Sequence, residues 1–358
     1  MAAYLNRIGT AVPPHDIHGE FVLTARTLLD DERARRLFAR MAERCGIARR
    51  WSVFEAAGEG GFDRGGFYRR GAFPDTAARM RRYEEEAPGL ALDAVAGLGL
   101  DAAGRAGITH LIVASCTGFY APGLDLQLVQ RLGLDPGVER TVVGFMGCYA
   151  AMNALKLARH IVRSEPAARV LVVNLELCTL HLQDSPDLET VLSFLIFGDG
   201  CAAGLVSAAP EGIALDGFRA VVIPGTAEQI TWRIGAGGFD MHLSGAVPAT
   251  LAGGLPAALP AILGGRGAGD VELWAVHPGG RTILDAVEQA ADLDGERLAD
   301  SRAVLRDFGN MSSATVMFVL KRMLDRFRAT GMGGNGLGCA MAFGPGLTAE
   351  TMTFHMAG

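Results

Sequence analysis

The sequence has no long hydrophobic run. Its 358 residues include no stretch of about 18 uninterrupted apolar residues, the length that a transmembrane helix needs. The N-terminal segment MAAYLNRIGTAV also lacks the basic start and apolar core of a secretory signal. We therefore expect no membrane span and no signal peptide, and a cytoplasmic location.

Lysine is also scarce, and acidic residues outnumber basic ones by 39 to 33. The formal net charge is −6, the sequence pI is near 5.8, and lysine occurs only at positions 156 and 321. Such a chain has no general attraction to nucleic acid or to anionic membranes. Any anionic ligand has to be held by a local basic patch.

Paired metal ligands are missing as well. The eight histidines form no H-E-x-x-H motif, and no C-x-x-C pair occurs among the six cysteines, at positions 45, 116, 148, 178, 201 and 339. In a reducing compartment this scatter favours free thiols over a disulfide framework. We expect no metal site.

What the sequence does contain is the composition of a large α/β protein. Apolar residues make up 49% and charged residues 20%, and the length exceeds what one hydrophobic core normally supports. Predicted strands, among them 4–12, 109–119 and 168–177, alternate with predicted helices. The pattern repeats after residues 208–210, so we predict two duplicated halves, 1–209 and 210–358.

Two helices are predicted early in the chain. Apolar spacing favours one helix over residues 24–50, and Arg40 and Arg44 lie four residues apart on one of its faces. A basic pair can hold phosphates, although such pairs more often form a solvated face. The segment FPDTAARMRRYEEEAP has an N-cap candidate in Asp75 and is expected to stop at Pro88.

Residues 141–163 contain a candidate nucleophile. They predict a short apolar strand, a sharp turn at Gly147 and an amphipathic helix that begins at Cys148. Unpaired backbone N–H groups and the helix dipole at that end favour a thiolate over a thiol. The alternative is that Cys148 is a buried cysteine that only fills space.

Two residues in the second half occupy comparable positions. His277 ends a buried strand and precedes Pro-Gly-Gly, and Asn310 precedes a helix. An imidazole can draw the proton from a thiol, and an amide together with an imidazole can donate to a developing oxyanion. Taken singly, such a histidine is more often structural and such an asparagine is more often an N-cap.

Together these motifs resemble a known family, the type III polyketide synthases, which are the chalcone-synthase-like homodimers of the thiolase superfamily. The resemblance runs nearly end to end. It is carried by FPDTAARMRRYEEEAP, GFMGCYAAMNALKLA, ARVLVVNLELC, FGDGCAAGLV, WAVHPGG, FGNMSSATVMFVL and AFGPGLTAET.

The resemblance implies a thiolase-like fold with a layered αβαβα architecture and a homodimer. It also implies acyl-CoA and malonyl-CoA as substrates, with no further cofactor. By position, Cys148 matches the acyl-carrying nucleophile, and His277 and Asn310 match the decarboxylation and oxyanion partners. Phe197 matches the gatekeeper between the CoA tunnel and the cavity.

Arg40 and Arg44 match two of the basic residues that hold the CoA phosphates in this family. The third basic position is Leu37 in this sequence, with Arg36 next to it. The resemblance therefore implies a phosphate site on the helix predicted over residues 24–50.

Cavity-lining positions of the family correspond to Cys116, Ala121, Cys178, His181, Trp232, Met241 and Ser312. His181 and Trp232 add bulk that should limit chain extension, whereas Met241 is flexible. The compact Cys116 and Cys178 favour a narrow apolar channel beside the nucleophile. We predict an aliphatic starter, extended two or three times to an alkylpyrone or alkylresorcinol.

Four alternatives stay open from the sequence. Ketoacyl-ACP synthase III also uses Cys, His and Asn but has its histidine in a His-x-Ala-Asn context, unlike His277-Pro-Gly-Gly. Thiolase has a second catalytic cysteine near the C-terminus, and Cys339 lies close to such a region, although a buried strand cysteine is the simpler interpretation. A cysteine hydrolase and a non-catalytic acyl-CoA-binding homologue are the other two.

Overall fold

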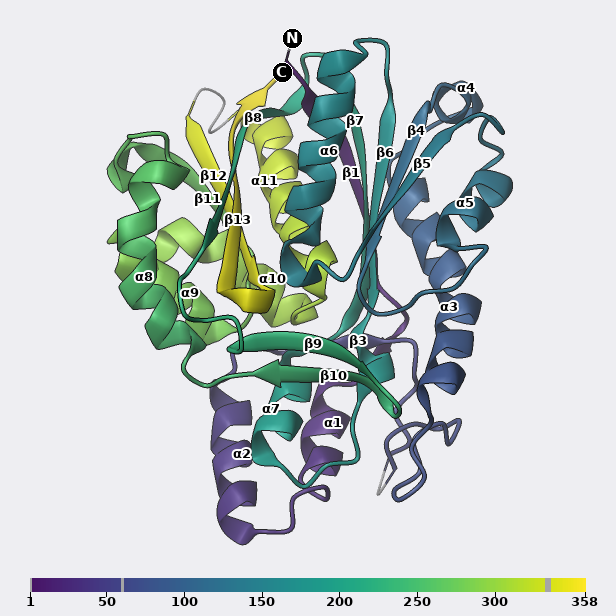
Figure 1. The fold of residues 1–358 in the computed structure, drawn as a ribbon, viewed down its shortest axis with the longest axis vertical. Helices are drawn as coiled ribbons and strands as arrows, with labels where there is room; N and C mark the ends of the chain where they lie inside the picture. Colours follow the sequence, from purple (N-terminus) through teal and green to yellow (C-terminus); the bar gives the residue numbers. More distant parts are fainter. Residues whose placement is uncertain (1, 59–60, 332–335) are drawn as a thin grey trace.

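A nine-stranded mixed sheet forms the centre of the protein, whose computed structural model describes residues 2–58, 61–331 and 336–358 (Figure 1). The strand order is β11-β12-β13-β8-β1-β7-β6-β4-β5. In chain order these strands are β1 (Tyr4–Ala11), β4 (His110–Ser115), β5 (Glu139–Gly144), β6 (Val170–Leu177), β7 (Asp199–Ser207), β8 (Gly212–Val222), β11 (Val271–Val276), β12 (Leu337–Gly344) and β13 (Thr348–Ala357).

The sheet has two halves that join at β1 and β8, where Tyr4 pairs with Ala214 and Leu5 with Ile213. Helices α6 (Ala150–Ser164) and α11 (Thr315–Thr330) lie between the halves (Figure 1). The outer face of one half is covered by α3 (Thr76–Ala96), α4 (Ala102–Ala106) and α5 (Leu124–Leu132), and that of the other by α8 (Val247–Ile262) and α9 (Arg281–Ala291). These five layers confirm the predicted αβαβα architecture.

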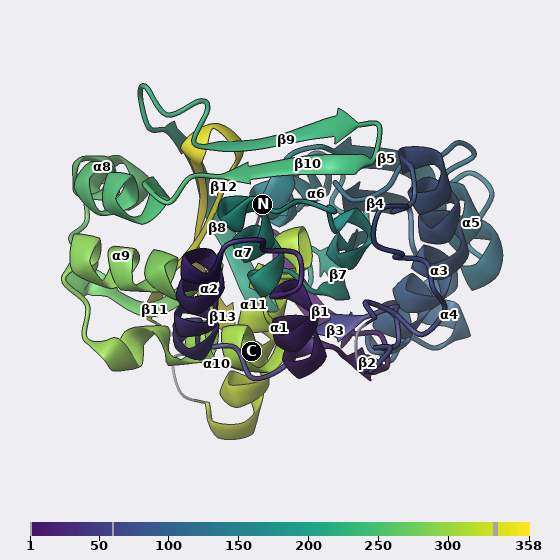
Figure 2. The same ribbon diagram turned by 90° about the horizontal axis from the view of Figure 1, so that it is seen from below.

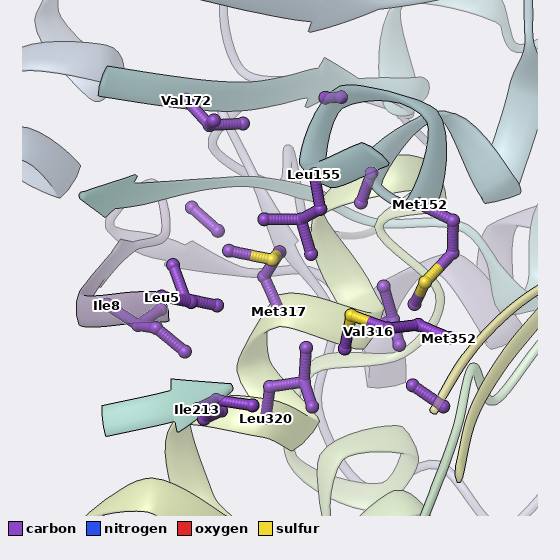
Figure 3. Packing of buried hydrophobic residues seen from close by; sticks show 14 of the residues in the cluster. Leu5, Ile8, Met152, Leu155, Val172, Ile213, Val316, Met317, Leu320 and Met352 are labelled. Carbon is purple, nitrogen blue, oxygen red and sulfur yellow. The ribbon is translucent and has the colours of Figure 1, made fainter. Parts of the chain in front are cut away.

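The two central helices are apolar on more than one face because sheet strands cover them from both sides. On α6 the buried residues include four alanines, which let the helix approach its neighbours closely. Leu155 of α6 and Met317 of α11 meet between strand residues such as Leu5 and Val172 (Figure 3). This shared core holds the N-terminal ends of both helices in fixed positions.

The single helix predicted over residues 24–50 is wrong. Two helices, α1 (His18–Ala25) and α2 (Glu32–Arg44), occupy this region, and a short strand, β3 (Trp51–Ser52), pairs with β2 (His15–Asp16). The break has a local cause, since the Asp31 side chain accepts a hydrogen bond from the Ala34 backbone N–H and so begins a new helix.

The predicted stop at Pro88 is also wrong, because α3 continues through it to Ala96. Proline removes one backbone hydrogen bond from a helix interior. Pro88 is buried together with Ala87, Leu90 and Ala91, so packing of this face against the sheet offsets that loss.

A hairpin crosses one end of the sheet. It consists of β9 (Ile230–Gly235) and β10 (Gly238–Leu243), which pair in antiparallel fashion. Viewed from below, the hairpin runs across the molecule on the opposite side from α1 and α10 (Ala299–Phe308) (Figure 2). The remaining helix, α7 (Leu188–Ile196), leads into β7.

In the described ranges, no helix combines the length and apolar character needed to cross a bilayer. All six cysteines are free thiols. Residues 2–58, 61–331 and 336–358 contain no group of three His, Cys, Asp or Glu side chains placed to hold a metal ion.

Candidate active site

Cys148 lies on a strained turn between β5 and α6. Phe145 and Gly147 both have positive φ, +55° and +69°, and a 3₁₀ turn (Gly147–Tyr149) precedes the α-helix. A Cβ atom on Gly147 would lie 2.4 Å from Cδ of Pro345, so only glycine fits this turn. The turn holds the Cys148 side chain in the interior, where the residue is 9% exposed.

The protonation state of Cys148 differs from the sequence prediction. Burial raises the pKa of the thiol to about 11, although hydrogen bonds with Ser312 and Asn310 act in the opposite direction. Desolvation therefore outweighs the polarity of the helix start, and Cys148 is a thiol at neutral pH. It becomes a nucleophile only when a base removes its proton.

His277 lies directly after β11 and is buried. Its backbone N–H donates to the Met341 carbonyl at 2.7 Å, which fixes the residue at the sheet edge. Burial lowers the pKa of the imidazole to about 3, so the ring is neutral at physiological pH. Neither ring nitrogen has a hydrogen-bond partner among the described residues, an arrangement that is costly unless a ligand supplies one.

Asn310 is held by contacts on both its backbone and its side chain. Its backbone N–H donates to Ile196 O at 2.8 Å, and its Nδ2 donates to Gly279 O at 3.2 Å. Its Oδ1 accepts from the Ser312 backbone N–H at 2.8 Å. The amide therefore also caps the short turn before α11, as the alternative interpretation expected, while it faces the same pocket as Cys148.

One pocket brings the predicted reactive residues together. Cys148, His277, Asn310 and Phe197 all line it, with apolar side chains from β10, α8 and α9 around them. A space that shares Cys148 and Phe197 with this pocket is lined by Cys116, Cys178, Trp232, Met241 and Ser312. Residues far apart in sequence thus converge on one buried thiol.

His181 lies behind this lining. Its Nε2 donates to Thr117 O at 2.7 Å and its Nδ1 accepts from the Phe239 backbone N–H at 3.0 Å. The ring stacks on Phe239 at 4.3 Å and meets Trp232 edge-on at 5.3 Å, and burial lowers its pKa to about 3. His181 therefore supports Trp232, whose Nε1 donates to Cys116 O at 2.7 Å.

Ala121 lies outside this pocket. It lines a separate surface hollow together with Phe119, Tyr120, Arg140 and Val142, next to the edge strand β5. Within one copy of the chain, Ala121 is therefore apart from the other predicted cavity residues.

Arg40 and Arg44 both lie on the exposed face of α2, together with Arg36 and the exposed Leu37. The backbone carbonyl of Arg44 accepts a hydrogen bond from Arg281 Nη1 at 3.3 Å. This contact joins the end of α2 to the start of α9, the helix that follows the His277 turn.

Glu176 is a residue of the site that the sequence prediction missed. It is fully buried on β6 and accepts from Ser313 Oγ at 2.5 Å, Thr117 Oγ1 at 2.8 Å and the Cys116 backbone N–H at 3.0 Å. Burial raises its pKa to about 7. The available signal was a lone carboxylate in the mostly apolar strand VLVVNLEL.

A buried thiol, a neutral imidazole and a carboxamide that share one pocket of a five-layered thiolase-like fold define a condensing enzyme. The description "Chalcone and stilbene synthases" matches the chain twice, its N-terminal domain over residues 2–210 and its C-terminal domain over residues 215–357. The chain therefore belongs to the chalcone and stilbene synthase family, the type III polyketide synthases, which are malonyl-CoA-dependent acyltransferases.

Individual relatives agree with this assignment. The chain is 38% identical to "Alpha-pyrone synthesis polyketide synthase-like Pks18" of Mycobacterium tuberculosis, covering 78% of this chain and 73% of that protein. It is 36% identical to bisdemethoxycurcumin synthase of Oryza sativa subsp. japonica, over 97% of this chain and 91% of the relative. The crystal structure of PKS-I from the brown alga Ectocarpus siliculosus superposes with a TM-score of 0.87 at 30% identity, covering 99% of this chain and 98% of that one.

Proposed function

We propose that Cys148 carries the growing acyl chain, while His277 and Asn310 drive decarboxylation of malonyl-CoA. The observation that carries this proposal is the shared pocket, in which a buried thiol faces an imidazole without protein partners. His277 takes the proton of the Cys148 thiol as the sulfur attacks the starter thioester, and it returns this proton to the CoA thiolate that leaves, so the ring is neutral again for extension.

Extension uses the same groups. The malonyl thioester carbonyl accepts hydrogen bonds from Asn310 Nδ2 and from an N–H of the neutral His277. The bond to the carboxylate carbon breaks, carbon dioxide leaves, and the electron pair moves onto the hydrogen-bonded oxygen. The resulting carbanion attacks the acyl thioester, and the bond between the acyl carbon and Cys148 sulfur breaks to regenerate the thiolate.

Phe197 is proposed to keep water away from the acyl thioester. It is buried and lines both spaces around Cys148. Exclusion of water limits hydrolysis of the bound intermediate.

The direct test of the function is mass spectrometry of products after incubation with malonyl-CoA and a panel of acyl-CoA starters. Products extended two or more times support a polyketide synthase. A product extended once and made only with an acyl carrier protein would indicate the ketoacyl synthase III alternative. Free acid formed without malonyl-CoA consumption would indicate a hydrolase.

Arg40 and Arg44 are proposed to hold CoA phosphates at the mouth of the site. We expect Arg40→Ala and Arg44→Ala each to raise the KM for CoA substrates about tenfold with little change in kcat, because phosphate binding is felt equally in the ground and transition states. Steady-state kinetics with acyl-CoA and malonyl-CoA measure this. A fall in kcat at unchanged KM would contradict the proposed role.

An aliphatic starter is proposed for the channel beside Cys148. Cys116 and Cys178 are small and Met241 is flexible, so this lining accepts a linear chain. Phe194 and Phe197 also line a second, separate cavity, together with Phe21, Phe54, Leu182 and Arg50. The name of the Mycobacterium tuberculosis relative mentions α-pyrone synthesis, which supports a pyrone as the product ring.

Cys178→Phe should fill this channel. Each starter methylene buried there contributes about 0.8 kcal/mol at most, so wild-type kcat/KM should increase with starter length until the channel is full. In the variant we expect the preference to move to short starters, measured by competition between acyl-CoA esters of different length. Cys178→Ser, which keeps the size, serves as the control. An unchanged length profile in Cys178→Phe would contradict the channel.

A homodimer is proposed through the face around β5. This strand is one of the two edges of the sheet, its Val142 is 51% exposed, and the hollow that contains Ala121 lies beside it. The unpaired backbone groups of an edge strand can pair with another chain. A second copy on this face accounts for the position of Ala121. This residue would then lie close to the cavity of the partner subunit, although it lies outside the cavity of its own chain.

We also propose that residues 1–209 and 210–358 act as duplicated halves of one catalytic unit. The first half supplies Cys148 and the second supplies His277 and Asn310. Each half contributes one of the two central helices, α6 or α11.

A further inference from the structure

The residue that connects the gatekeeper to the catalytic amide is Arg50, a buried arginine outside the pocket of Cys148. It is 1% exposed and follows α2 in the segment leading to β3. Its backbone is fixed on both sides, because its N–H donates to Asp16 Oδ1 at 3.1 Å and its carbonyl accepts from the Ile17 N–H at 2.8 Å. The side chain therefore starts from a rigid position.

The guanidinium of Arg50 binds the end of α7. Its Nη1 donates to Phe194 O at 2.8 Å and to Phe197 O at 2.5 Å. These carbonyls belong to the last turn of the helix and to the gatekeeper itself. Charge-assisted hydrogen bonds of this kind are stronger than neutral ones and fix the backbone that carries the Phe197 ring.

The guanidinium makes two further contacts, while its buried Nη2 has no hydrogen-bond partner among the described residues. Its Nε donates to His18 Nδ1 at 3.0 Å, and its Cζ lies 4.5 Å above the ring centre of Phe21. Burial and the charge of Arg50 lower the pKa of His18 to about 4, so that ring stays neutral and can accept. Burial lowers the pKa of Arg50 itself to about 10, which leaves it protonated at neutral pH.

The aliphatic stem of Arg50 packs beside the residue that precedes Asn310. Gly309 has a φ of +69°, and a Cβ there would lie 2.8 Å from both Arg50 Cγ and Ile196 O. Phe197 and Asn310 form a parallel β-bridge, in which Asn310 N–H donates to Ile196 O and Gly198 N–H donates to Asn310 O at 2.9 Å. Arg50 therefore touches both strands of this bridge.

We propose that Arg50 is a positioning residue for condensation, which holds the Phe197 gate and the Asn310 amide as one unit. This inference rests on the proposed roles of those two residues. Arg50 touches no reacting atom. It acts by fixing the positions of the Asn310 amide and the Phe197 ring relative to Cys148.

The test is Arg50→Lys, which keeps the charge but cannot donate to both carbonyls and to His18. We expect kcat for condensation to fall about 10- to 100-fold, as small misplacements of catalytic groups do, with the KM for CoA substrates within about threefold. The share of starter released as free acid should increase, because Phe197 no longer excludes water. Amide hydrogen exchange at Gly198 and Asn310 should become faster.

Arg159→Lys is the matched control. Arg159 also donates to two backbone carbonyls, Leu215 O at 2.7 Å and Asp216 O at 2.6 Å, but outside the site. We expect its turnover and free-acid share to equal those of the wild type. If Arg50→Lys loses activity only in proportion to folded protein, with unchanged free-acid share and exchange, the positioning role is wrong.

If Arg50→Lys does not fold, a second pair of variants tests the positioning role of Arg50. His18→Asn keeps an acceptor near the position of Nδ1, whereas His18→Leu removes it. We expect the free-acid share to increase only in His18→Leu, and equal behaviour of the two would overturn the proposal. The proposed function is tested separately, since extended products of the wild type are observed or absent whatever these variants do.

Discussion

Cys148→Ala should abolish condensation and acyl loading while leaving part of the malonyl-CoA decarboxylation. The thiol is the only group of the proposed set that bonds covalently to the chain, so its loss should lower product formation by at least about 1,000-fold. His277 and Asn310 should keep their places, because His277 is held by Met341, and Asn310 is held by Ile196 and Gly279 in addition to its hydrogen bond with Cys148. Release of carbon dioxide from malonyl-CoA should therefore persist.

Intact mass spectrometry after incubation with an acyl-CoA checks the loading step. The wild type should gain one acyl group, and Cys148→Ala should gain none. Acylation of the variant would show that another of the six thiols carries the chain. Cys339→Ala is a suitable control, because Cys339 is buried on β12, away from the pocket.

Glu176→Gln should change how stability depends on pH. The pKa of Glu176 is raised from 4.5 to about 7 by burial, so the folded protein binds more protons than the unfolded chain between these values. The free energy of unfolding of the wild type should therefore fall as pH rises from 4.5 to 7, by about 3 kcal/mol from this group. The variant lacks this contribution, and its stability relative to the wild type should increase across the same interval.

Denaturant unfolding of both proteins at several pH values measures the difference. Asp199→Asn is the matched control, since burial raises the pKa of Asp199 from 3.8 to about 6, and its contribution should be complete near pH 6. If wild type and Glu176→Gln change in parallel between pH 6 and 7, Glu176 does not titrate there.

The positions of the proposed catalytic residues were predictable because each follows a strong local signal. A buried strand, a glycine turn and a helix surround Cys148, and a buried strand ends in His277-Pro-Gly-Gly. Such local patterns predict that the two residues lie at the same edge of a sheet, but they do not predict the protonation states of the side chains. Burial of Cys148, which depends on residues from both halves, raises the pKa of its thiol and so opposes the effect of the helix start.

Other features depended on contacts that no local pattern contains. Pro88 predicts the end of a helix, yet α3 continues past it because tertiary packing stabilises this segment. Strand β9 is half exposed and its ITWRIG segment has little alternation, so its hairpin partner decides its structure. Arg50 looks like any residue of a basic stretch until the chain brings Phe197 and Gly309 against it.

The place of β1 in the sheet has a consequence for how the chain folds. Its neighbours are β7 and β8, which begin at Asp199 and Gly212, so the first strand to be synthesised pairs with strands made much later. Closing so large a loop has a high entropic cost and slows folding. On the ribosome, residues 4–11 must stay unpaired until β7 has emerged, and the two halves of the sheet cannot join until β8 has followed.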